Sequence, residues 1–148
     1  MRNDRRGIEG LPLRLMIVAL LVSLTLPLLL SSMDQAASGM AERRLEQEAE
    51  DLARSIEGLA AAGPGNVRFM DVASDLPSGS EIRLGGGGGT AESARVSWYM
   101  DGAEVGRRYL QGAEVVTADG SPIGLGPGAS MVLRCPANIW GVVEADRA

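Results

Sequence analysis

The side chains that could do chemistry are few in this sequence, because the chain contains no His. That absence removes the commonest general base and metal ligand, and with it any Ser-His-Asp arrangement or Cys/His metal set. Carboxylates are plentiful, but the only close group is the acidic run at 46–51, which is typical of a solvated helix face. We therefore expect no enzyme activity, no metal site and no cofactor.

Cys135 is the remaining candidate nucleophile, and it is the single cysteine of the chain. A neighbouring cation such as Arg134 can lower a thiol pKa and activate it, and an unpaired cysteine can instead link to another chain. The third alternative, which we favour, is a half-buried structural cysteine. One cysteine excludes an internal disulfide.

Two further features could suggest nucleotide or nucleic-acid binding. The run Gly85–Gly89 lacks the Gly-Lys-Ser/Thr ending and the following helix of a phosphate-binding loop, so it predicts a flexible connection between strands. The formal charge is −5 and the pI about 4.8. An acidic chain lacks the basic patch that nucleic acid requires, so we expect no nucleic-acid partner.

The dominant element of the chain is an apolar stretch near the N-terminus. No charged residue occurs from Leu15 to Met33, and a helix over residues 11–30 would be about 30 Å long, the thickness of a bilayer core. Basic residues precede it, at Arg2, Arg5 and Arg6. The positive-inside rule therefore places the N-terminus in the cytoplasm and the rest of this single-pass chain outside.

The leader Arg5-Arg6-Gly7, followed by Ile8 and the apolar helix, resembles the prepilins of type IV filament systems, and most closely archaeal pilin-like proteins with a class III signal peptide. The resemblance implies that residues 1–7 are a leader and that a prepilin-type peptidase cuts after Gly7. It also implies that Glu9 takes the place of the family's early acidic residue, which pairs with a neighbour's terminal amine. In the commonest pattern that residue is the fifth of the mature chain, where Pro12 stands here.

Pro27 lies within the apolar helix that is expected over residues 8–33. We predict a kink and not a break, with the hydroxyls of Ser23 and Thr25 bonding the carbonyl that the proline leaves free. Prolines are frequent in this part of the helix in the resembling family, and they are also common in transmembrane helices generally.

The pattern becomes amphipathic over residues 34–62, which we expect to continue the first helix. Its apolar positions recur at steps of four and three, at Leu45, Ala49, Leu52, Ile56 and Leu59. On the other side, Glu50 and Arg54 predict a surface ion pair. The sequence Gly63-Pro64-Gly65 predicts the helix end.

Residues 66–148 predict a β-rich extracellular head. Asp101-Gly102 is typical of a hairpin turn, and we expect the five aromatic residues of this region to pack in the core or on a sheet face. The predicted strands are 67–72, 81–84, 95–100, 106–110, 114–116, 130–135 and 140–144. The fold class is thus α+β, a long N-terminal helix packed on a small antiparallel sheet or sandwich, as in pilins.

The resemblance implies a structural subunit of an archaeal type IV pilus-like surface filament, at the cell membrane and extracellular surface. Its partners would be the membrane, the peptidase, itself and other pilin-like subunits, and the short glycine-rich head favours a minor subunit. One alternative is an uncleaved anchor that displays the head as a binding or adhesion module. Another is a secreted domain cut near residues 36–38.

Overall fold

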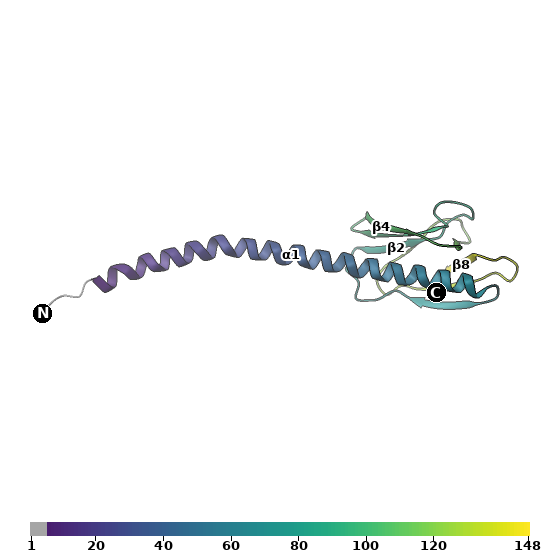
Figure 1. Ribbon diagram of the computed structural model, residues 1–148, viewed down its shortest axis with the longest axis horizontal. Helices are drawn as coiled ribbons and strands as arrows, with labels where there is room; N and C mark the ends of the chain where they lie inside the picture. Colours follow the sequence, from purple (N-terminus) through teal and green to yellow (C-terminus); the bar gives the residue numbers. More distant parts are fainter. Residues whose placement is uncertain (1–5) are drawn as a thin grey trace. The chain divides into compact units, whose positions relative to one another are not determined.

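The computed structural model describes residues 6–148, with side chains from residue 12 onward (Figure 1). One helix precedes eight strands: α1 (Arg6–Ala62), β1 (Val67–Asp71), β2 (Ser80–Leu84), β3 (Arg95–Met100), β4 (Ala103–Tyr109), β5 (Glu114–Val116), β6 (Ile123–Leu125), β7 (Ser130–Arg134) and β8 (Val142–Arg147). The chain divides into two compact units, of which the first ends at Met40 and the second is Ala41–Ala148.

Within the first unit, α1 continues through Pro27 without a break, as predicted. The hydroxyl groups, however, do not bond the carbonyl of Ser23. The Ser23 hydroxyl donates to the carbonyl of Leu20 at 2.9 Å, and that of Thr25 to the carbonyl of Leu21 at 2.9 Å. Helix hydroxyls reach back three or four residues, so the Ser23 carbonyl would need a hydroxyl at position 26 or 27, where leucine and proline stand.

In the second unit, the predicted apolar stripe of α1 is confirmed. Leu45, Ala49, Leu52, Ile56 and Leu59 are all buried. The helix ends at Ala62, as Gly63-Pro64-Gly65 predicted. Asn66 completes the cap, because its side-chain amide donates to the carbonyls of Ala62 at 3.1 Å and Gly63 at 2.9 Å, groups that a helix end leaves without backbone donors.

The strands form two four-stranded sheets, in the orders β1-β7-β8-β5 and β4-β3-β2-β6. Figure 1 shows them gathered along the C-terminal part of α1. Most pairs are antiparallel, as predicted, but β5 and β8 pair in parallel, with Val115 opposite Val143. Parallel neighbours need a long connection, and here β6 and β7 lie between them in the sequence.

The predicted hairpin between β3 and β4 is confirmed. Asp101 and Gly102 both have positive φ, 50° and 81°, the combination that a two-residue turn matching strand twist requires. Three other strand predictions need correction. The three-residue β6 was missed because Ile123–Leu125 is too short to show alternation. The strand predicted over 106–110 runs over Ala103–Tyr109, since Ala103 and Glu104 still pair with β3. Likewise, β8 runs over Val142–Arg147 and not 140–144, since its polar end still pairs with β7.

One core joins the helix stripe to both sheets. Trp98 is the buried aromatic residue of this core. Opposite it on β4 stands Gly106, where a side chain would not fit, because a Cβ there would come within 2.4 Å of the indole.

The prediction that all five aromatics pack in the core or on a sheet face is wrong for Phe69, Tyr109 and Trp140, which are 57–76% exposed. Phe69 precedes Met70, which packs against the core. Successive strand residues face opposite ways, so Phe69 points outward.

Candidate functional site

The first candidate site is the apolar surface of α1 between residues 12 and 33. Its large apolar side chains are 50–71% exposed: Leu13, Leu15, Met16, Ile17, Val18, Leu20, Leu21, Val22, Leu24, Leu26, Leu28, Leu29, Leu30 and Met33. Contiguous apolar surface of this kind is unfavourable in water and marks a membrane or protein contact. The helix is long and apolar enough to cross a membrane.

The predicted processing and assembly residues lie at the edge of the described chain. Arg5 is outside the described residues. Arg6, Gly7, Ile8 and Glu9 belong to α1, but their side chains lie outside the described part. The cleavage site and the role of Glu9 therefore stay predictions.

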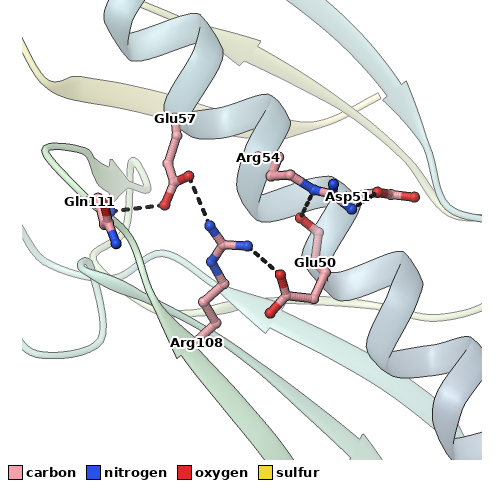
Figure 2. A network of polar contacts seen from close by, with 6 residues as sticks. All are labelled: Glu50, Asp51, Arg54, Glu57, Arg108 and Gln111. Atoms are coloured by element: carbon pink, nitrogen blue, oxygen red, sulfur yellow. Dashed lines mark hydrogen bonds and ion pairs between the residues drawn. The ribbon is translucent and has the colours of Figure 1, made fainter.

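A second cluster, the Arg108 network, lies wholly within the Ala41–Ala148 unit (Figure 2). Arg108 on β4 forms ion pairs with Glu50 and Glu57, which are two helical turns apart on α1, and its Nη2 lies 3.0 Å from Glu57 Oε2. The other oxygen of Glu57 accepts the backbone N–H of Gln111 at 2.9 Å. Because the guanidinium pairs with both carboxylates of the helix, this network holds β4 on α1.

The predicted Glu50–Arg54 ion pair is therefore wrong. Arg54 Nη2 pairs with Asp51 Oδ1 at 2.5 Å, and Arg54 Nε donates to the backbone carbonyl of Glu50 at 3.4 Å. The carboxylate of Glu50 is taken by Arg108 instead. The local spacing of four residues suggested the pair, whereas nothing local in the sequence points to a partner more than fifty residues away.

Cys135 is buried more deeply than the half-buried position we expected, with 5% of its surface exposed. Its Sγ donates to the carbonyl of Leu59 at 3.4 Å, and burial raises the pKa of the thiol. Arg134, the cation that could have activated it, is exposed, as expected for the next residue of a strand. The structural role of Cys135 is favoured over the activated thiol.

We accordingly expect Cys135 to resist alkylation in the folded protein. Only the thiolate attacks iodoacetamide, and both the raised pKa and the burial lower its availability. At pH 8, labelling of the full chain in detergent micelles, followed by intact mass, should be at least about tenfold slower than in urea. Equal rates in both conditions would contradict a buried, inert thiol.

The glycine run connects β2 to β3, as predicted, but hydrogen bonds fix much of it. Gly86 forms a parallel bridge with Val116 and accepts the N–H of Thr117 at 3.3 Å. The N–H of Gly89 donates to the carboxylate of Glu114 at 3.1 Å. The loop is thus tied to β5 and the residue after it, so the expectation of a flexible linker is corrected to a hydrogen-bonded loop.

No family model, curated protein or solved structure matches this chain. The class is therefore defined by the fold and the apolar helix alone. The chain is an α+β protein with one N-terminal helix long and apolar enough to span a membrane, followed by two four-stranded, mostly antiparallel sheets that share one core with the C-terminal part of that helix.

Proposed function

We propose that the protein is a structural subunit of an archaeal type IV pilus-like surface filament. In this proposal the protein is cut after Gly7 and resides in the membrane as a single-pass protein with its N-terminus on the cytoplasmic side. It then assembles into the filament through its N-terminal helix. The observation that carries the proposal is the exposed apolar surface of α1 over residues 12–33. A helical segment whose apolar side chains are exposed in this way needs either lipid or copies of itself around it.

The chemistry of assembly is an exchange of lipid contacts for helix contacts. Lipid tails are as apolar as leucine, so helix association in a bilayer depends on close packing, which small residues favour. Ala19 and Ser23 supply such positions within the leucine-rich surface. The carboxylate of Glu9 would be costly in an apolar interior unless paired, so a neighbour's terminal amine would set the axial register.

The Ala41–Ala148 unit supports the proposal in a second way. Its core is closed by side chains from α1 and from both sheets. Such a unit can stay folded on the surface while the apolar helix moves from lipid to a filament interior. Its short strands and glycine-rich loops favour a minor subunit.

The test is the N-terminal residue of the membrane-associated protein, produced in an archaeal host with a class III signal peptidase and read by intact mass spectrometry. We expect the chain to start at Ile8 and to be recovered partly as a detergent-resistant polymer. Gly7→Val should abolish the cut, because in the resembling family the peptidase cuts after the glycine that ends the leader. Gly10→Val, three residues on, is the matched control and should still be cut.

A start at Met1, with the protein dissolving in detergent as a monomer, would overturn the filament proposal. It would favour the anchored binding module. A start near residue 39, with recovery from the medium, would favour the secreted domain.

A further inference from the structure

The outward face of the β4-β3-β2-β6 sheet carries a hollow of about 210 Å³. It is lined by Arg83 on β2, by Arg95, Ser97 and Tyr99 on β3, and by Glu92 and Pro122 from the adjoining loops, among others. The alternate residues of β3, Val96 and Trp98, belong to the core. The hollow therefore lies on the side of the sheet that faces away from α1.

Ser97 is the first unusual feature of this hollow. Only 2% of its surface is exposed. Its Oγ is the one buried side-chain nitrogen or oxygen without a hydrogen-bond partner in the part of the chain that the structure describes. Burying an unpaired hydroxyl is unfavourable, and native proteins rarely leave one without a reason. The hydroxyl can donate to a group that enters the hollow.

Arg95 is the second unusual feature. Its side chain is only 24% exposed, yet its nearest acid, Glu92, is 3.9 Å away, beyond hydrogen-bond distance. The side chain of Arg108 is exposed to a similar extent, 22%, but it has two carboxylates bound to it. Among the described residues, the Arg95 guanidinium has no hydrogen-bond acceptor within range, so its N–H groups are available.

Arg83 is the residue of β2 that pairs with Ser97 of β3, and its side chain is held in place by two contacts. Its Nη2 lies 2.7 Å from Glu81 Oε2, and its guanidinium carbon is 4.3 Å from the centre of the Tyr99 ring. Arg83 therefore lines one side of the hollow with its guanidinium already bound to Glu81, whereas Arg95 and Ser97 supply the unpaired hydrogen-bond donors.

We propose that this hollow binds the carboxylate group of a small organic acid. Arg95 donates two parallel N–H groups to the two carboxylate oxygens, the geometry that a guanidinium favours, and Ser97 donates its hydroxyl to one of them. Glu81 already pairs with Arg83, so Arg95 is the lining cation that binds the single negative charge of a carboxylate, while Glu92 beside it disfavours a dianion such as phosphate.

The size of the hollow limits what enters it. Pockets that enclose whole drug-sized ligands are about 300–1,000 Å³, so only the acid end of the ligand fits inside. The remainder of the molecule lies in solvent, next to Tyr99 and Pro122. This binding role is independent of the proposed filament function, since every lining residue belongs to the Ala41–Ala148 unit.

The test uses the full chain in nonionic detergent micelles with ¹⁵N-labelled arginine. The Nε–H signals of Arg83 and Arg95 are followed by NMR during titration with sodium glucuronate at constant ionic strength. We expect a saturable shift with half-saturation at about 1–10 mM. Glucose, the matched neutral probe, should give none. Inorganic phosphate should bind at least about threefold more weakly, because of Glu92.

Two variants and one control separate the site from the rest of the sheet. Arg95→Gln should weaken glucuronate binding about tenfold or more, and Ser97→Ala about threefold to tenfold, both followed at Arg83. Ser97→Ala should not lower the thermal unfolding temperature, because the Ser97 hydroxyl has no hydrogen-bond partner to lose. Arg107→Gln, on the neighbouring strand and outside this hollow, should bind as the unmodified protein does.

Three outcomes would overturn the proposal. The first is the absence of a saturable shift up to about 100 mM glucuronate. The second is phosphate binding as tightly as glucuronate, which would indicate a general anion site. The third is full binding in Ser97→Ala and Arg95→Gln, or equal loss in Arg107→Gln.

Discussion

Ile56→Ala is expected to lower the free energy of unfolding of the Ala41–Ala148 unit by about 2–5 kcal/mol. Ile56 is completely buried, in the cluster where the helix stripe meets both sheets. The substitution removes apolar contacts and leaves a cavity that rigid strands cannot fill. The effect should be measured by urea unfolding of the full chain in micelles.

Tryptophan fluorescence can report this unfolding. The chain has two tryptophans, of which Trp98 is 6% exposed and Trp140 is 72% exposed. In a Trp140→Phe background, the emission comes from the core residue alone, and its red shift follows exposure of the core.

Two controls make the Ile56 result specific. Ile56→Val should cost about 0.5–1.5 kcal/mol, in proportion to the smaller volume removed. Arg54→Ala, on the exposed side of the same helix, should change stability by no more than about 1 kcal/mol, because it loses a surface ion pair and one long hydrogen bond to a backbone carbonyl, both exposed. If Ile56→Ala changed stability no more than Arg54→Ala, the helix would not form part of the core.

The helix stripe could be predicted because its cause is local. A helix repeats every 3.6 residues, so apolar residues at steps of four and three share one side wherever the partner comes from. The same is true of the Asp101-Gly102 turn, whose backbone requirement is met by two adjacent residues. The end of α1 at Ala62 was predictable for this reason too, although the cap by Asn66 was not.

The features that sequence reasoning missed depend on distant residues. Arg108 takes Glu50 from the local partner that spacing suggested, because β4 lies on the helix in the folded unit. The exposure of Phe69 and Trp140 depends on which side of a sheet is covered, and hydrophobicity alone does not decide that. The hollow at Ser97 arises from residues of two strands and two loops, and Arg-Val-Ser gives no local sign of it.

The second large effect is expected at Arg108. Arg108→Met would leave Glu50 and Glu57 without their cation, with side chains 36% and 20% exposed. Breaking a fully buried pair costs about 3–5 kcal/mol. Partial exposure screens the charges here, so we expect a loss of about 1–3 kcal/mol in urea unfolding of the full chain. Arg108→Lys should recover only part, since an ammonium group cannot bond both carboxylates as the guanidinium fork does.

The double variant Arg108→Met/Glu57→Gln separates a lost attraction from a stranded charge. Glu57→Gln keeps an oxygen that can accept the Gln111 N–H, and it removes one of the two unpaired charges. We therefore expect the double variant to be more stable than the sum of the single effects predicts, by about 0.5–3 kcal/mol. Arg107→Met, one residue earlier on β4, loses a pair with Glu104 at 2.8 Å and an interaction with Tyr109, both at a half-exposed position, and should cost no more than about 1 kcal/mol. Additive effects, or an equal loss at Arg107, would mean that the Arg108 network does not hold β4 on the helix.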